Sequence, residues 1–369
     1  MPQGEGVDEV YERVAEKLGV YGFHKKGDDI EYLMELFSPE EAKVVSYLAV
    51  LLPRKTPEEV AEESSLSLDR VKSALQGAAK KGAVAFFKKE GSYCLLWPGP
   101  GFLELSGMFP SKAGDEDKVR RLGRIMERGF FEGSMGCEIG ASDSPWARVV
   151  PIEKSLDARS EILPFEKVSG FIEDAERVFL GHCFCRTMWR HCNNPTETCI
   201  FLDFGLDIGF DFLVDEGVLR KIDKGKAYEI LENCERAGLV HTAMNSQKGS
   251  LFLCNCCTCC CAVLRGLTEL HNPRAFVKSN FVPSIDKEKC NKCEACVKIC
   301  PMGALFYHRG HTPDMSDDEI KRFEERCIGC GLCATHCPKE AITLVKVRTD
   351  IPPQDVVSTL MEYQAKRIH

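Results

Sequence analysis

The sequence predicts an α+β protein in which an N-terminal helical domain, a central cysteine-rich domain and a small C-terminal domain follow one another. Three observations support this prediction. Helix-start signals and a hairpin pattern occupy the first part of the chain, two groups of cysteines lie in the middle, and two identical cysteine runs lie near the end. We place the domains at residues 1–105, 106–280 and 281–346, and we expect a helix over residues 347–369.

Composition and charge narrow the class of protein. The chain is 44% hydrophobic and 28% charged, which is typical of a soluble protein with a buried core. The formal net charge of -8 disfavours a general binder of nucleic acid or membrane surfaces. No apolar run approaches about 18 residues, so we expect no membrane span, and the N-terminus lacks the pattern of a signal peptide. We therefore expect a cytoplasmic protein whose 21 cysteines stay reduced and bind metal rather than form disulfides.

The N-terminal domain begins with strong helix signals. Ser38 with Glu41, and Thr56 with Glu59, each form a capping box followed directly by proline. A third helix is expected from Ser67 to the glycine at position 82, and its buried stripe would consist of Leu68, Val71, Leu75 and Ala78. The following "AVAFFKKEGSYCLLW" predicts a β-hairpin that turns at the Glu-Gly pair.

This order of helices and hairpin resembles a winged-helix domain over about residues 28–98. The resemblance implies that the third helix is a reading helix, and its exposed side chains would be Lys72, Ser73, Gln76 and Lys80. That face is only modestly basic, so a protein-interaction role is favoured over DNA binding, and both stay open. A second basic stretch, "KVRRLGRIMER", is surrounded by acidic residues and is interpreted as a solvated helix.

The C-terminal domain contains two copies of the spacing C-x2-C-x2-C-x3-C-P. The first copy consists of Cys290, Cys293, Cys296 and Cys300, and the second of Cys327, Cys330, Cys333 and Cys337. Two residues between ligands let a tight loop wrap one face of an iron–sulfur cube. Zinc knuckles are disfavoured, because a four-ligand zinc site gives the third cysteine and the proline no role.

Residues 281–346 resemble bacterial two-[4Fe-4S] ferredoxins. The resemblance implies one cluster on Cys290, Cys293, Cys296 and Cys337, and a second on Cys327, Cys330, Cys333 and Cys300. Strands are expected in "FVPSI" and "AITLVKV", on either side of the two runs. Between the runs we expect a strand in "ALFY" and a helix over residues 316–326 capped by Ser316. His308 and His311 are interpreted as solvated loop residues.

Most of the other cysteines form two groups in the central domain. The first group is Cys183, Cys185, Cys192 and Cys199, and the second is Cys254, Cys256, Cys257, Cys259, Cys260 and Cys261. Disulfides between adjacent cysteines would be strained, because neighbouring α-carbons lie about 3.8 Å apart and relaxed disulfides need about 4.4–6.8 Å. Soft sulfur ligands select iron–sulfur clusters, zinc or copper(I). We expect the two groups to converge on one metal centre. If most of these thiols are ligands, we expect a second centre as well. Cys260 or Cys261 could instead face the core.

The central region also resembles multi-cluster 4Fe-4S proteins of anaerobes, over roughly residues 147–346. The resemblance rests on "CFCR" followed by "CNCC" upstream of the ferredoxin-like runs, and it implies one or two further [4Fe-4S] clusters. The isolated Cys94, Cys137 and Cys234 are interpreted as structural. His182 and His191 could replace a cysteine as ligand, but this is the less favoured interpretation.

The sequence shows no pattern for nucleotide, nucleoside triphosphate or flavin binding, and no catalytic residue is assigned. We therefore predict an iron–sulfur protein that passes single electrons between redox partner proteins, such as the other subunits of an oxidoreductase complex. The alternative is a redox-sensing winged-helix transcription regulator. A reductase that acts through a central cluster is a weaker third hypothesis, and the sequence leaves homo-oligomerisation open.

Overall fold

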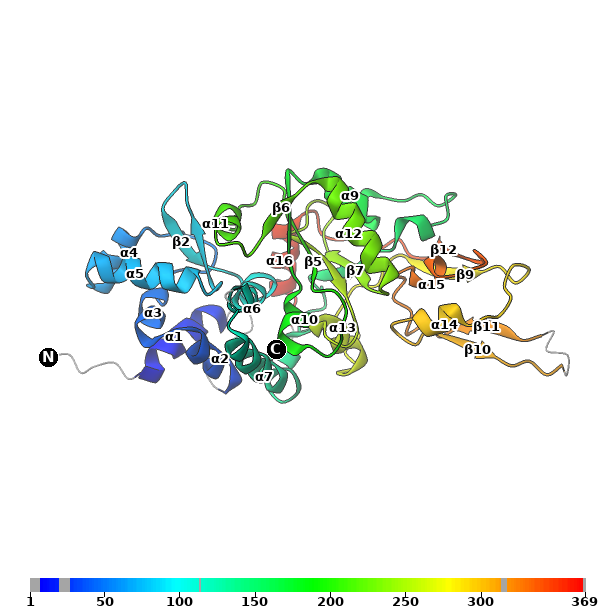
Figure 1. Ribbon diagram of the computed structural model, residues 1–369, viewed down its shortest axis with the longest axis horizontal. Helices are drawn as coiled ribbons and strands as arrows, with labels where there is room; N and C mark the ends of the chain where they lie inside the picture. Colours follow the sequence, from blue (N-terminus) through cyan, green and yellow to red (C-terminus); the bar gives the residue numbers. More distant parts are fainter. Residues whose placement is uncertain (1–6, 20–26, 113, 313–316, 368–369) are drawn as a thin grey trace. The chain divides into compact units, whose positions relative to one another are not determined.

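The computed structural model describes residues 7–19, 27–112, 114–312 and 317–367 (Figure 1). The chain forms two compact units, which we describe separately. Unit 1 comprises Met1–Ile139, Gly181–Thr196 and Leu206–Arg220, and unit 2 comprises Gly140–Leu180, Glu197–Gly205 and Lys221–His369. Helices dominate unit 1 and strands are frequent in unit 2, so the predicted α+β class is confirmed.

Unit 1 begins with a run of helices and one hairpin. These elements are α1 (Val7–Gly19), α2 (Asp28–Leu36), α3 (Pro39–Val45), α4 (Pro57–Ser64), α5 (Leu68–Ala79), β1 (Val84–Phe87) and β2 (Ser92–Leu95). They are followed by η1 (Pro98–Phe102), α6 (Leu103–Lys112), α7 (Glu116–Phe131) and α8 (Ser134–Glu138), and by two later helices, α10 (Phe184–Trp189) and α11 (Phe210–Asp215).

Both predicted capping boxes are present in unit 1. The Ser38 backbone N–H donates to the Glu41 carboxylate at 2.7 Å, and the Glu41 N–H donates back to the Ser38 hydroxyl at 3.3 Å. Thr56 and Glu59 make the same pair of bonds at 2.7 and 3.3 Å. These bonds satisfy backbone donors that have no partner inside the helix, so both helices begin where the sequence predicts.

The helix and hairpin that follow also agree with the sequence. Helix α5 buries Val71, Leu75 and Ala78 as predicted, whereas Leu68 is only half-buried. Strands β1 and β2 pair antiparallel in the register Val84↔Leu95 to Phe87↔Ser92. The turn between them includes a glycine with a φ of 63°, a conformation that favours glycine.

Unit 2 is organised around a six-stranded sheet with the order β3-β7-β8-β5-β4-β6. The strands are β3 (Ala147–Val149), β4 (Arg177–His182), β5 (Glu197–Asp203), β6 (Arg220–Ile222), β7 (Val240–Met244) and β8 (Phe252–Cys256). The helical elements of this part of the unit are η2 (Glu153–Ser155), η3 (Pro164–Glu166), α9 (Val168–Asp174), α12 (Lys224–Arg236) and α13 (Ala262–Thr268). Strand β8 runs antiparallel to both β7 and β5, and every residue of β7 is buried.

Within the described residues, the C-terminal part of unit 2 contains two small antiparallel strand pairs and three helices. Strand β9 (Phe281–Ile285) pairs with β12 (Ile342–Lys346), so both predicted flanking strands are present. Strand β10 (Leu305–His308) pairs with β11 (Glu319–Arg322) (Figure 1). The helices are α14 (Ala295–Ile299), α15 (Leu332–Thr335) and α16 (Val356–Ala365), and the last lies within residues 347–369, where we expect a helix.

The helix predicted over residues 316–326 is wrong. Residues 319–322 form strand β11 instead, and Ser316 lies outside the described residues. Ile320 is buried against Leu305 and Ile342, while its neighbour Lys321 is exposed. Pairing with β10 therefore outweighs the helix propensity of this charge-rich segment. Among the described residues, no helix is long and apolar enough to cross a membrane.

Candidate metal centres

Four thiols of the C-terminal runs line one apolar pocket. Cys300, Cys327, Cys330 and Cys333 line it together with Pro283, Met302, Leu305 and Ile328. Gly329 and Gly331 in the second run have φ values of 71° and 89°, which side chains rarely adopt. A Cβ on Gly329 would also meet the Phe281 carbonyl, and one on Gly331 would meet the Ser155 hydroxyl. Glycine therefore lets this loop turn closely around the pocket.

Burial raises the pKa values of three thiols of this pocket. Burial, with a contribution from the neighbouring Cys300 and Cys327, raises the pKa of Cys330 to about 12. Burial followed by Cys330, Cys327 and Cys300 raises the pKa of Cys333 well above its ordinary value. Several thiols can ionise together in this pocket only beside a positively charged partner, and a metal centre supplies that charge.

A second set of thiols gathers around Cys296. Burial, followed by the neighbouring Cys290 and Cys337, raises the pKa of Cys296 to about 11. These three thiols lie in a core with Leu305 and Ile342, while Cys293 is exposed. The last cysteine of each run thus lies with cysteines of the other run. Cys337 lies near Cys296, and Cys300 lies near Cys327.

A backbone N–H group donates a hydrogen bond to the last cysteine of each run. The Ala304 N–H donates to the Cys300 sulfur at 3.2 Å, and the Ala341 N–H donates to the Cys337 sulfur at 3.3 Å. Such bonds stabilise a thiolate and raise the reduction potential of a cluster bound to it. Soft thiol donors in a dry pocket with backbone N–H support fit a [4Fe-4S] cluster.

The second central cysteine group divides into two parts within unit 2. The sulfur atoms of Cys257, Cys259 and Cys260 all lie within 4.8 Å of one another. Cys256 and Cys261 are instead buried in an apolar core with Val240, Leu264 and Ile328, and Cys254 packs at its edge. Helix α13 begins after Cys261, so Cys257 and Cys260 lie in the turn that precedes this helix.

The first central group is divided between the two units. Cys183, Cys185 and Cys192 belong to unit 1, and Cys199 is buried in strand β5 of unit 2. The Cys185 thiol and burial raise the pKa of Cys183 well above its ordinary value. The Cys183 N–H donates to the Thr196 carbonyl at 2.6 Å and buried Arg186 donates to the Pro195 carbonyl at 2.8 Å, so both ends of this loop are held together.

The three isolated cysteines and the two histidines beside the first central group lie in different environments. Cys94 and Cys234 are buried, and Cys137 is exposed. Nδ1 of His182 lies 3.3 Å from the Thr196 hydroxyl, and Nε2 of His191 lies 3.9 Å from the Glu127 carboxylate.

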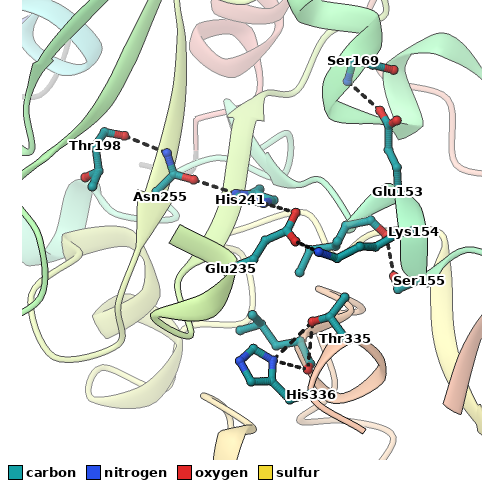
Figure 2. Close-up of polar contacts among 12 residues, drawn as sticks. Glu153, Lys154, Ser155, Ser169, Thr198, Glu235, His241, Asn255, Thr335 and His336 are labelled. Atoms are coloured by element: carbon teal, nitrogen blue, oxygen red, sulfur yellow. Dashed lines mark hydrogen bonds and ion pairs between the residues drawn. The ribbon is translucent and has the colours of Figure 1, made fainter. Parts of the chain in front are cut away.

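The sequence did not predict a series of buried polar side chains in unit 2, which contact one another in turn (Figure 2). His241 lies between Asn255 and Glu235, and Glu235 also contacts Lys154. The Asn255 amide donates to the Thr198 carbonyl at 2.7 Å. The only sequence signal was a polar residue, His241, inside the apolar run that forms β7.

The C-terminal runs are also similar to known proteins. Residues 282–350 match the family described as 4Fe-4S dicluster domain. Ferredoxin-3 of Nostoc sp. is 40% identical over 93 residues, which cover 22% of this chain and 93% of the relative. The chain belongs to the 4Fe-4S dicluster ferredoxin family. Its ferredoxin domain, residues 282–350, therefore carries [4Fe-4S] clusters and serves iron–sulfur electron transfer.

Other relatives match the ferredoxin domain as part of larger systems. Pyruvate synthase subunit PorD of Methanocaldococcus jannaschii is 39% identical over 69 residues, 18% of this chain and 69% of the relative. An archaeal-type glutamate synthase [NADPH] of Thermotoga maritima is 39% identical over 77 residues, 21% of this chain. The match spans only 14% of the length of that synthase, so it concerns the ferredoxin domain alone.

Proposed function

We propose that the whole chain is an iron–sulfur electron carrier that passes single electrons between redox partner proteins. The observation that carries this proposal is the crossed arrangement of thiols in the ferredoxin domain, with Cys300 in the pocket of Cys327, Cys330 and Cys333. The crossing brings the two cysteine runs together, so electrons can pass between two closely spaced centres.

In the ferredoxin domain each cluster takes three ligands from one run and one from the other. The first cluster uses Cys290, Cys293, Cys296 and Cys337, and the second uses Cys327, Cys330, Cys333 and Cys300. The mutual effects of these thiols on their pKa values support both sets, apart from Cys293. Exposed Cys293 would complete the first set on the solvent side.

A third cluster is proposed in the central segments, with Cys257, Cys259 and Cys260 as three of its ligands. The fourth would come from the group Cys183, Cys185, Cys192 and Cys199. Strand topology supports this: β5 and β8 are antiparallel neighbours, so the start of β5 and the end of β8 share one edge of the sheet. The first group ends with Cys199 near the start of β5, and the second begins with Cys254 and Cys256 at the end of β8, so both groups include residues at that edge.

The number of central clusters depends on the central cysteines that are not ligands of the third cluster. Cys256 and Cys261 lie in the apolar core, where they act as small hydrophobic residues. Cys254 and the unused thiols of the first group would be enough for a fourth cluster. The iron content of the protein decides between one and two central clusters.

Residues 28–98 are proposed to form a winged-helix domain that docks on a partner protein. On α5 the exposed Lys72 lies 3.0 Å from Glu58, and Lys80 lies 3.6 Å from Glu216. Phosphates of DNA would have to displace these carboxylates, so protein docking is favoured over DNA binding. The partner would be an oxidoreductase, as the subunit name of the pyruvate synthase relative suggests.

Electron transfer and DNA binding can be compared on the same sample. We expect the anaerobically reduced holoprotein to reduce a low-potential ferredoxin in a stopped-flow experiment, and the Cys327→Ser variant to do so more slowly. A mobility-shift assay at stated salt concentrations runs in parallel. Sequence-dependent DNA binding that responds to cluster state, without electron transfer, would replace this proposal by the transcription-regulator alternative.

A further inference from the structure

A cleft in unit 2 adjoins the pocket that contains Cys300, Cys327, Cys330 and Cys333. It encloses about 540 Å³, a volume typical of small-molecule sites. One wall comes from the end of α13 and the segment after it, and the other comes from the ferredoxin domain. Its apolar lining consists of Leu267, Pro273, Met302 and Ile328, and its polar lining consists of Thr268, His271, Lys278, Glu325 and Arg326.

Met302 and Ile328 separate this cleft from the thiol pocket. Both side chains line the cleft, and both also line the pocket that contains Cys300 and Cys327. These two side chains therefore lie both beside a molecule in the cleft and beside the pocket that would hold the second cluster. A charge bound in the cleft would act on the cluster across an apolar layer, where it is poorly screened.

Two cations stand at the cleft with their side chains held in place. The Arg326 guanidinium lies 5.1 Å from the centroid of the Phe323 ring, and the Lys278 ammonium donates to the Glu325 carbonyl. In the part of the chain that the structure describes, no ion pair joins Lys278 or Arg326 to a carboxylate.

The rim also contains one negative group, the exposed carboxylate of Glu325, and the imidazole of His271 is exposed as well. Two cations against one carboxylate give the cleft a positive balance in a chain whose net charge is -8. Charged rim groups and an apolar lining together define the chemistry of a ligand: a negative head and an apolar body.

We propose that this cleft binds a small organic anion, with its carboxylate or phosphate on Lys278 and Arg326 and its apolar body against Leu267, Met302 and Ile328. The binding does not depend on the proposed electron-transfer function of the whole chain. Its effect on the second cluster does depend on that cluster, because a bound negative charge disfavours an added electron and lowers the reduction potential.

Calorimetric titration of the oxidised, anaerobic, full-length holoprotein tests the proposal with four probes. Phenylacetate and phenyl phosphate carry both ligand features, phenylacetamide lacks the charge, and acetate lacks the apolar body. We expect both aromatic anions to bind. Phenylacetamide should bind at least about tenfold more weakly because it loses the charge-assisted hydrogen bonds, and acetate should do so because it buries no apolar ring. Whichever aromatic anion binds more tightly identifies the head group as phosphate or carboxylate.

Variants show whether the binding takes place in this cleft. Arg326→Gln and Lys278→Gln should each weaken phenyl phosphate binding by about tenfold. Lys287→Gln removes the same charge from a residue that does not line the cleft, and it should leave binding unchanged. Thr268→Trp fills the cleft from α13 without changing a charged residue and should abolish binding. It therefore tests the cleft independently of the charge variants, in case these fold poorly.

Several results would overturn the proposal. The absence of binding by both aromatic anions excludes an anion site of this kind, and equal binding of phenylacetamide shows that charge plays no part. Unchanged binding in the Thr268→Trp protein places the ligand elsewhere. In redox titrations, phenyl phosphate should lower the potential of the second cluster in the unmodified protein and not in Thr268→Trp, and this difference is separate from any electron transfer to a partner.

Discussion

Nε2 of His241 lies 3.3 Å from a carboxylate oxygen of Glu235, and the two side chains are only 1% and 11% exposed. Nδ1 of the same ring lies 2.6 Å from Oδ1 of Asn255, whose amide nitrogen donates elsewhere. Both ring nitrogens therefore face acceptor oxygens. The His241–Glu235 contact joins α12 to β7, and the Lys154 ammonium of η2 approaches the other Glu235 oxygen at 2.8 Å.

Glu235→Gln should destabilise unit 2 by about 1–3 kcal/mol, because it removes the charge that His241 and Lys154 face. Burial raises the pKa of Glu235, but His241 and Lys154 outweigh burial, so its pKa lies below the ordinary value. The stabilisation is therefore present above the ordinary pKa of glutamate and is lost as pH falls through the lower value in the folded protein. Chemical denaturation at several pH values measures this, with exposed Glu232→Gln on the same helix as control. Equal losses in both variants would contradict the prediction.

Cys300→Ser should remove the second cluster of the ferredoxin domain and leave the first. Cys300 lies in the first cysteine run, but it lines the pocket of Cys327, Cys330 and Cys333. Electron paramagnetic resonance of the reduced protein, together with iron counts, should show about four irons lost per chain. Cys234→Ser, which changes a buried thiol in α12, should lose no iron. Loss of the first cluster instead would contradict the crossed ligand sets.

Cys259→Ser should lower the iron content of the full-length protein by about four atoms and spare the ferredoxin signals. Cys261→Ser should retain the iron and lower stability instead, because a hydroxyl enters the apolar core around Leu264 and Ile328. Iron analysis and thermal unfolding of the two variants separate these effects. The reverse pattern would show that Cys261, and not the turn before α13, supplies the ligand.

Thr56→Ala should cost about 1 kcal/mol of stability, because the Thr56 hydroxyl accepts a bond from the backbone of Glu59. Ser67→Ala should cost less, since the Ser67 side chain makes no capping hydrogen bond at the start of α5. Denaturant midpoints of the two full-length variants measure the difference. A larger loss for Ser67→Ala would show that capping does not set the stability of these helices.

The features that local rules control could be predicted from the sequence. The capping boxes at Ser38 and Thr56 and the ligand spacing after Cys290 involve residues three or four positions apart, so a linear pattern contains them. The strand at Glu319–Arg322 could not be predicted, because its cause is pairing with β10 and burial of Ile320. Tertiary packing also decides which of the adjacent thiols Cys260 and Cys261 gathers with Cys257.

The number of electrons that the anaerobically reconstituted, full-length protein takes up tests the central claim most directly. Coulometric titration should show uptake of at least about three electrons per chain, one for each [4Fe-4S] cluster, and return of these electrons to an oxidised low-potential ferredoxin. Uptake of about two electrons or fewer would contradict the central cluster. Uptake without return to any protein acceptor would contradict electron transfer as the function of the chain.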